Sequence, residues 1–144
     1  MMNTQRLPYA SLSADLLQGL RQAKTALESS SLDSALIELI YLRVSQINGC
    51  SYCLGLHASA LRKRGESQQR LDALAGWHSS SLFSPRERIA LQWAEALTDI
   101  CHNHAADEDY EALKSHFDDK EISDLTFAIS LMNAMNRLAV AMRQ

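Results

Sequence analysis

Two cysteines and a histidine are spaced so that they could react together. Cys50 and Cys53 are three residues apart, and His57 follows Cys53 by four residues. On a helix this spacing puts the two thiols within disulfide reach and places the imidazole over Cys53. His57 is seven residues from Cys50, which is a distance of about 10 Å along the helix axis at 1.5 Å per residue. We therefore expect Cys53 to be the activated thiol and Cys50 to be its resolving partner.

The position of the pair in the chain favours a thiolate. Gly49 permits a tight turn, so Cys50 is expected in the first turn of a helix, where free backbone N–H groups and the helix dipole stabilise negative charge. A thiolate is both a nucleophile and a metal ligand. A zinc site is therefore the chemical alternative, with His57 as third ligand and His102 or His104 as fourth. A pair of buried structural thiols is a further alternative.

Glu38 adds a carboxylate to this group. It lies between apolar neighbours in the sequence, and a buried carboxylate needs a partner. If the helices on either side of Asn48-Gly49 form an antiparallel hairpin, Glu38 lies about three turns before the bend and His57 about two turns after it. Glu38 would then orient His57, which would accept the proton of Cys53. An ion pair with Arg43 is the alternative for this carboxylate.

The elements that must position these residues are predicted to be helices. Apolar residues recur every three to four positions, and the chain has only two prolines and five glycines. This pattern predicts an all-α, single-domain bundle of about six to seven helices, with the Cys-x-x-Cys pair at the start of a helix that follows a helical hairpin turn. The predicted helices cover about residues 14–28, 33–48, 50–64, 67–75, 85–100, 107–116 and 119–142. No repeat or linker divides the chain, so one domain is expected over residues 1–144.

Two helix starts carry recognisable signals. Ser84, Pro85 and Glu87 form a capping box with proline in the first turn. Ser13 is the expected cap of the first helix, whose stripe is Leu16, Leu20, Ala23 and Leu27. The last helix is apolar on more than one face, which indicates a central helix or one shared with another subunit.

The composition of the chain limits its expected partners and cellular compartment. The 144 residues are 47% hydrophobic and 22% charged, and the net charge of −3 gives no reason to expect nucleic acid as a partner. The N-terminal residues lack the apolar core of a secretory signal, and no run approaches the ~18 apolar residues of a membrane span. We expect a cytoplasmic protein without a membrane partner. In that reducing compartment a close cysteine pair indicates catalysis or metal binding, and Cys101 is left over.

The spacing of Glu38, Cys50, Cys53 and His57 resembles that of the alkylhydroperoxidase D-like members of the carboxymuconolactone decarboxylase superfamily. In both, the first cysteine follows the glutamate by twelve residues and the histidine follows the second cysteine by four. Residues 48–53, 83–88, 93–98 and 136–137 are also similar to this family. The resemblance covers about residues 33–140.

The resemblance implies an all-α homo-oligomer, a trimer or a hexamer, that reduces hydrogen peroxide or organic hydroperoxides. Cys53 would attack the peroxide, and Cys50 would resolve the resulting sulfenate as a disulfide. Glu38 and His57 would form the proton relay. No metal or cofactor is expected, and the electrons would come from a dithiol or a lipoyl-bearing protein.

One position departs from the best-studied branch of this family. Tyr52 stands where that branch has a histidine between the cysteines, and it is a candidate residue of the pocket. Two other functions stay open. A carboxymuconolactone decarboxylase-type enzyme is one, although that branch generally lacks the cysteine pair, and a non-enzymatic redox sensor is the other.

Overall fold

The structure is a computed structural model that describes residues 4–144, and this part of the chain contains helices and no strand. Residues 1–3, which begin the segment expected to lack a signal sequence, lie outside the described residues. The helices are α1 (Tyr9–Leu12), α2 (Ala14–Glu28), α3 (Ser34–Asn48), α4 (Ser51–Lys63), α5 (Gln68–Ala73), the 3-10 helix η1 (Leu74–Ser79), α6 (Pro85–Thr98), α7 (Ile100–Asn103), α8 (Asp107–Leu113) and α9 (Asp119–Met142). The all-α prediction is confirmed, with the short α1, η1 and α7 in addition to the seven predicted helices.

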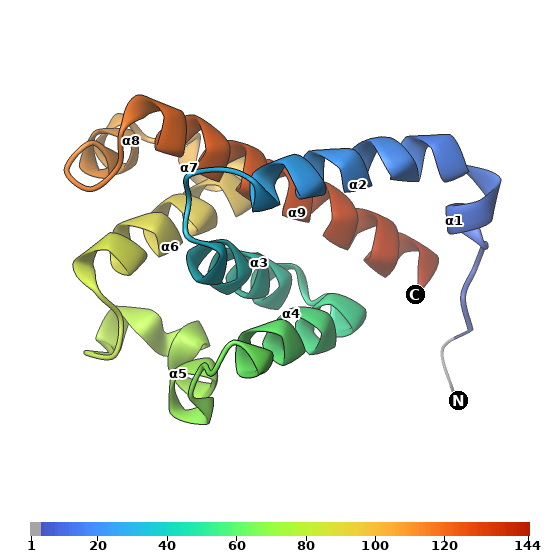
Figure 1. Cartoon of the computed structure of the whole chain (residues 1–144), viewed down its shortest axis with the longest axis horizontal. Helices are drawn as coiled ribbons and strands as arrows, with labels where there is room; N and C mark the ends of the chain where they lie inside the picture. The colour runs from blue at the N-terminus through green and yellow to red at the C-terminus, as the bar shows by residue number, and fades with distance from the viewer. Residues whose placement is uncertain (1–3) are drawn as a thin grey trace.

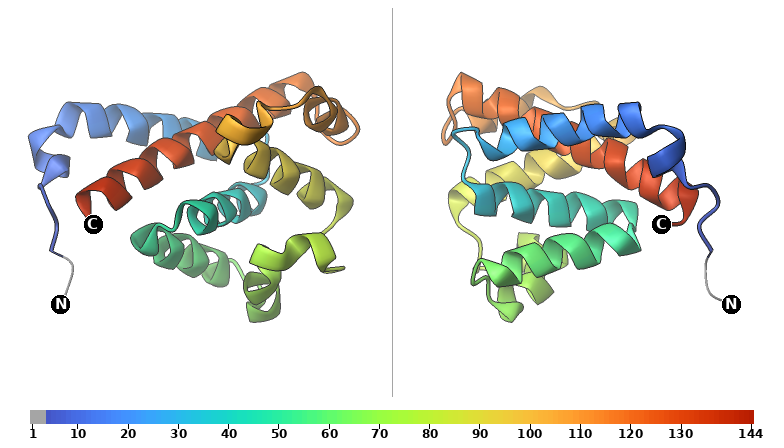
Figure 2. Two further views of the ribbon diagram at one scale, coloured as in Figure 1. Left: turned by 180° about the vertical axis from the view of Figure 1, so that it is seen from behind. Right: turned by 45° about the vertical axis from the view of Figure 1, so that its right-hand side comes forward.

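Helix α3 is the centre of the fold. It packs against α9 on one side and α4 on the other, and it also contacts α6 and η1. In Figures 1 and 2, α2 and α9 lie along one side of α3, while α4 and α5 lie along the opposite side. Leu39, Ile40 and Val44 of α3 are almost completely buried in the main apolar core. A helix in this position can present side chains to several neighbours at once.

The turn between α3 and α4 follows from local sequence. Gly49 ends α3 with φ of 66°, in the left-handed region that costs glycine little. Cys50 is the N-cap of α4, which begins at Ser51, so the two helices form the predicted hairpin. The cysteine pair therefore lies at the N-terminal end of α4, as predicted.

Helix α9 spans the molecule and closes the core. Asp118 and Glu121 form its capping box, and Ile129 and Met132 are among its buried residues. On length and composition alone it could cross a membrane, with 39% of its 18-residue apolar window buried in the fold. The central helix of a folded domain meets the same criterion, so this feature is weak evidence for a membrane span.

Helix α2 is less embedded than its apolar stripe suggests. Leu27 is its one buried residue, and Leu16, a member of the predicted stripe, is 75% exposed. Ser13 is at the N-cap position but its side chain makes no capping hydrogen bond, so that prediction is wrong. The segment before α2 is joined to the end of α9 by the Arg6 amide, which donates to the Met142 carbonyl at 2.8 Å. Of the predicted stripe, Leu27 is in the main core and Leu20 packs against it, whereas Leu16 and Ala23 are exposed.

Helix α6 begins with the predicted capping box of Ser84 and Glu87. It ends at Thr98, slightly before the predicted end near Ile100, because a new turn, α7, starts there. Between the predicted helices at residues 67–75 and 85–100, the chain forms the 3-10 helix η1, and residues 80–84 after it are not helical. Arg88 holds this segment by donating to the carbonyls of Trp77 and Ser80 at 2.9 and 2.8 Å.

Candidate thiol redox site

Cys50 and Cys53 form a disulfide at the start of α4, with their Cα atoms 5.3 Å apart. Both are buried, and they pack with Ala139 of α9 in a small cluster separate from the main core. The backbone N–H of Cys53 points at the Cys50 sulfur, at 3.3 Å. Cys50 therefore caps the helix through its side chain. The backbone N–H stabilises negative charge on the Cys50 sulfur and not on the Cys53 sulfur.

Glu38 and His57 meet across the α3–α4 hairpin. Nδ1 of His57 donates to Oε2 of Glu38 at 2.8 Å, and His57 is only 1% exposed. The expected meeting of these two side chains is therefore confirmed. The alternative partner is wrong, because Arg43 instead pairs with Glu95 at 2.9 Å. With Nδ1 engaged by a carboxylate, the ring is fixed in place and its Nε2 is left to exchange a proton.

Tyr41, one turn after Glu38 on α3, supports the imidazole from a second side. Its ring centroid is 5.2 Å from that of His57, and the residue is 2% exposed. Within residues 4–144 its hydroxyl has no hydrogen-bond partner. Burial, with the nearby carboxylates of Glu38 and Glu28, raises the pKa of Tyr41 well above its usual value. The hydroxyl is therefore a neutral group next to the His57–Glu38 pair.

A pocket of about 390 Å³ opens over the second cysteine. Cys53 and His57 line it together, and the half-exposed ring of Tyr52 forms part of its rim, as the sequence suggested. Cys50 is not among the lining residues. The apolar wall comes from three helices and comprises Leu17, Leu56, Met132, Met135, Leu138 and Ala139. A small molecule in this pocket would reach Cys53 before Cys50.

A set of buried amides fixes the turn that carries the cysteines. Nδ2 of Asn48 donates to Oδ1 of Asn133 at 3.0 Å and to Oδ1 of Asn136 at 3.1 Å. Asn136 in turn donates to the Ser45 hydroxyl at 3.1 Å. These bonds join the last turn of α3 to α9 immediately before Gly49 and Cys50. The sequence indicates a role for Asn136 only through its similarity to the family. The signal that could have predicted this contact is a polar residue within the apolar pattern of the last helix.

The histidines suggested for a zinc site do not join the cysteine pair. His102 lies on α7, where it pairs with Asp99, and His104 follows at the end of that helix. Across residues 4–144 no group of three or more histidine, cysteine, aspartate or glutamate side chains is placed to hold a metal ion. Cys101 is exposed and is not in a disulfide. We assign these three residues no part in the site.

The arrangement supports thiol redox chemistry. It provides one thiol at a pocket beside an oriented imidazole, and a second thiol within covalent reach of the first. An imidazole held by a carboxylate can take the thiol proton and later return it to a leaving group. The sulfenate formed when a thiolate meets an oxidant can condense with a neighbouring thiol to give a disulfide.

Known proteins resemble this chain over most of its length. Residues 13–96 match the model of the carboxymuconolactone decarboxylase family. The chain is 34% identical to the uncharacterized protein YdfG of Bacillus subtilis over 96% of its own length and 95% of that protein. The residues of this chain that match the family model include α3, α4 and the turn between them.

Solved structures share the fold closely. A protein of unknown function from Agrobacterium tumefaciens, ATU0492, whose description connects it with the antioxidant defence protein AhpD, superposes with a TM-score of 0.94. It is 35% identical, with 98% of this chain and 97% of that chain covered. An uncharacterized peroxidase-related protein from Silicibacter sp. TM1040 gives a TM-score of 0.80 at 28% identity, with 91% and 70% covered.

Proposed function

Because this chain belongs to the carboxymuconolactone decarboxylase family and carries an AhpD-like Cys-x-x-Cys pair, we propose that it is a thiol-dependent peroxidase that reduces hydrogen peroxide or organic hydroperoxides. One observation carries the proposal. Cys53 lines a pocket together with His57, whose ring is fixed by Glu38 at 2.8 Å, while Cys50 is bonded to Cys53 from the side away from the pocket.

In the oxidising half of the cycle, His57 acts first as a base and then as an acid. His57 takes the proton of the Cys53 thiol, and the thiolate attacks the terminal oxygen of the peroxide. The O–O bond breaks, Cys53 becomes a sulfenic acid, and the leaving alkoxide or hydroxide receives a proton from His57. The Cys50 thiol then loses its proton and attacks the Cys53 sulfur. The disulfide forms as the S–O bond breaks, and the expelled hydroxide takes up that proton and leaves as water.

The reducing half needs an external dithiol, and a lipoyl-bearing protein is our proposed donor. One thiolate of the donor attacks the Cys53 sulfur, which is the sulfur that faces the pocket. Cys50 leaves as a thiolate next to the backbone N–H of Cys53, which lowers the cost of its negative charge. The second thiol of the donor then releases Cys53 and leaves the donor as a disulfide.

Mass analysis of the cysteine peptides after limiting peroxide tests the assignment of roles. We expect a Cys50–Cys53 disulfide in the wild type and a trapped sulfenic acid on Cys53 in the Cys50→Ser variant. The Cys53→Ser variant should keep Cys50 as a thiol on the same time scale. Cys101→Ser is the matched control, because this exposed cysteine is outside the site and its loss should change nothing. Fast oxidation of Cys50 in the Cys53→Ser variant would reverse the roles.

Turnover separates an enzyme from a redox sensor. The wild type should consume many equivalents of peroxide when a dithiol such as dihydrolipoamide is present in excess. One equivalent of peroxide per chain, followed by a stable disulfide, would identify a sensor instead.

We also propose that the protein assembles as a homo-oligomer, a trimer or a hexamer. Large apolar side chains are exposed on the two long outer helices, such as Leu16 of α2 and Phe127 of α9. Apolar surface of this kind on a single chain is typical of an interface between subunits. Light scattering on the purified protein would give the subunit number directly, and a monomer at micromolar concentration would contradict the proposal.

A further inference from the structure

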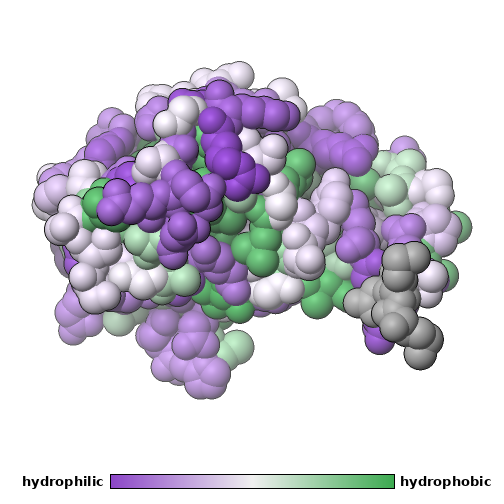
Figure 3. All heavy atoms as spheres, turned by 90° about the horizontal axis from the view of Figure 1, so that it is seen from below, coloured by the Kyte–Doolittle hydropathy of each residue, from purple (hydrophilic) through white to green (hydrophobic). Residues whose placement is uncertain are grey.

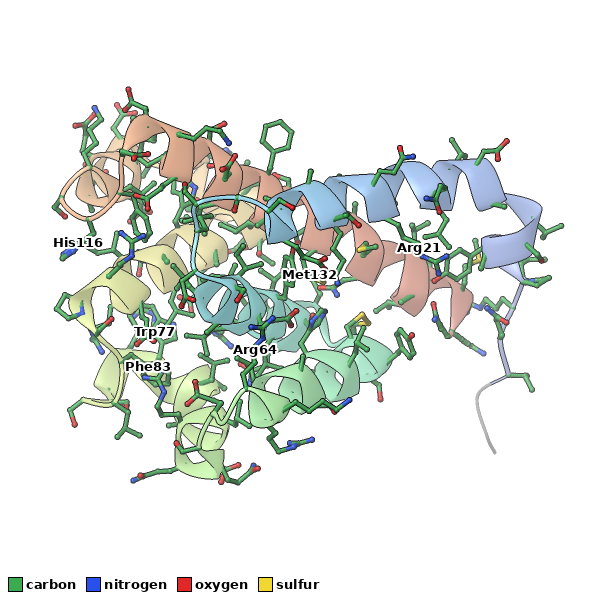
Figure 4. All side chains as sticks on the ribbon, viewed as in Figure 1. Arg21, Arg64, Trp77, Phe83, His116 and Met132 are labelled. Carbon is green, nitrogen blue, oxygen red and sulfur yellow. A yellow bond between two sulfur atoms is a disulfide. The ribbon has the colours of Figure 1, made fainter. Side chains whose placement is uncertain are left out.

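The pocket over Cys53 has a cationic side that the proposed chemistry does not require. Its apolar wall is formed mainly by α9, but α2 contributes Arg21 and the Lys24–Glu28 ion pair to the same pocket. Figure 4 shows Arg21 between α2 and the C-terminal part of α9. Hydrogen peroxide carries no charge and fills little of a pocket of about 390 Å³. This volume lies within the range of about 300 to 1,000 Å³ that is usual for small-molecule sites.

The two cations differ in how far they are already neutralised. Lys24 makes a long ion pair with Glu28, with 3.4 Å between Nζ and Oε1. Arg21 has no salt-bridge partner within residues 4–144. Its positive charge is close enough to Tyr9 to oppose the rise in the pKa of that phenol, which burial causes. Arg21 is therefore the cation of this pocket that is available to an anionic ligand.

Polar side chains lie near Arg21 in the pocket. Tyr9 and Gln144 both line it, and the Tyr9 hydroxyl donates to the Gln144 side-chain carbonyl. Arg6 holds this region together through bonds to the carbonyls of Met142 and Ala141. The same pocket is thus lined by a sulfur and an imidazole, by an apolar wall and by a cation. In Figure 3, which looks from the side of α4 and α5, hydrophobic atoms are visible between hydrophilic regions of the surface.

We infer that the preferred substrate is an amphipathic organic hydroperoxide with a carboxylate at the far end of an apolar chain, and that Arg21 is the residue that selects it. The inference rests on the proposed peroxidase function and names the substrate class of that site. The carboxylate pairs with Arg21, which can bind both of its oxygens, while the apolar chain lies along Met135 and Leu138. The peroxide group reaches Cys53, where the same cleavage of the O–O bond gives the sulfenic acid and a hydroxy acid.

A pair of substrates that differ only in charge tests the inference. The initial rates of a fatty-acid hydroperoxide and of its methyl ester would be compared, with hydrogen peroxide as a third substrate. We expect kcat/KM for the acid to exceed that for the ester by about fivefold or more, as one partly exposed charged hydrogen-bond pair allows. In Arg21→Gln this advantage should disappear through a higher KM at unchanged kcat, because the contact is made far from the reacting atoms. Hydrogen peroxide kinetics should not change.

Arg62→Gln is the matched control, since Arg62 is an exposed arginine of α4 that does not line the pocket. It should leave all three substrates unaffected. Binding of dodecanoate, which has no peroxide group, gives a readout without turnover. Calorimetry should show binding to the wild type that weakens by about fivefold in Arg21→Gln and in 0.5 M salt.

The possible outcomes distinguish the inference about the substrate from the proposed peroxidase function. Reduction of all peroxides at rates independent of the carboxylate, or an equal loss for acid, ester and hydrogen peroxide in Arg21→Gln, would overturn the inference and leave the peroxidase proposal standing. Absence of turnover with every peroxide would overturn the proposed function. A charge preference found for the dithiol donor and not for the peroxide would place the reductant at Arg21 and also overturn the inference.

Discussion

The two sulfur atoms of the site differ in their surroundings, and the difference assigns their tasks. Cys53 lines the pocket together with His57. The Cys50 sulfur does not line the pocket and accepts a hydrogen bond from the backbone N–H of Cys53. A thiol that must attack needs access and a base, and a thiol that must leave needs stabilisation of its charge. The four-residue step from Cys53 to His57 predicted the first of these from sequence. The stabilisation of the Cys50 thiolate depends on the hydrogen bond at the helix N-cap, and the sequence indicated only that Cys50 is near the start of the helix.

Glu38→Gln tests the carboxylate without removing its hydrogen bond. The amide of glutamine can still accept from Nδ1 of His57, but it carries no charge to stabilise the imidazolium. We expect the rate of Cys53 oxidation by peroxide to fall by about tenfold or more, with the fold retained. Stopped-flow kinetics and circular dichroism would measure the two effects. Glu111→Gln, an exposed change on α8, is the control, and equal rates for Glu38→Gln and wild type would remove Glu38 from the relay.

Tyr41→Phe tests the buried hydroxyl beside His57. The ring would keep its packing, while a hydroxyl that has no partner within residues 4–144 would be lost. Because an unsatisfied buried hydroxyl costs free energy, the variant should be as stable as the wild type or more stable by about 1 kcal/mol. Urea denaturation would give the free energy of unfolding. A loss of more than about 1 kcal/mol would show that the hydroxyl is bonded in solution, for example to a buried water molecule.

At the scale of the elements, local signals predicted the α3–α4 hairpin but not how α2 packs on the rest of the chain. Gly49 and the spacing of Glu38 from the cysteines are enough to place one helix against the next. The spacing of Leu16 and Leu20 shows that α2 has an apolar stripe, but not which surface the stripe will cover. That choice depends on partners such as Arg6 and Met142, which are far apart in the chain.

The same limit explains the segment before α6. The helix predicted over residues 67–75 was expected to end before Gly76, whereas Leu74–Ser79 forms the 3-10 helix η1. The carbonyls of Trp77, His78 and Ser80 accept hydrogen bonds from one guanidinium, that of Arg88 on the next helix. Turn-forming residues give the local preference of a segment, and a tertiary hydrogen bond can override it.

Two glycines should respond in opposite ways to the same substitution. Gly49 has a positive φ and no atom within 4 Å of an added Cβ, so Gly49→Ala costs only conformational energy, about 1 kcal/mol. Gly19 lies inside α2, also with open space around it, so Gly19→Ala should stabilise by about 0.5 to 1 kcal/mol. Gly49→Asn should cost less than Gly49→Ala, because asparagine tolerates this backbone conformation better. Chemical denaturation of the three variants would measure these differences, and a stabilised Gly49→Ala would contradict the account of the turn.

For the molecule as a whole, Glu95 joins three separate elements. From α6 it accepts hydrogen bonds from Arg43 of α3 at 2.9 Å and from Trp77 and His78 of η1 at 2.7 and 2.8 Å. Sequence spacing could not reveal this cluster, because its members come from three elements. It holds η1 and α6 against the central helix, whose other face carries the site.

The Glu95 cluster should make the stability of the protein sensitive to acid. Burial raises the pKa of Glu95, but the hydrogen bonds from His78, Trp77 and Arg43 outweigh it and hold the pKa below its usual value. A carboxylate with a lowered folded-state pKa contributes stability that is fully present above its unfolded pKa, about 4.3, and is lost as the pH falls through the folded value. Glu87, paired with Arg70, shifts in the same direction.

Glu95→Gln should therefore be less stable than the wild type by about 2 kcal/mol at pH 7, because Arg43 and Trp77 lose a charged acceptor. The gap should narrow below about pH 4, where the wild type loses the same charge. Urea denaturation of both proteins at pH 7, 5 and 3.5 would show it, with the exposed Glu108→Gln as the control. A gap that stays constant over this range would mean that the charge of Glu95 contributes nothing and that only the shape of its side chain holds α3, η1 and α6 together.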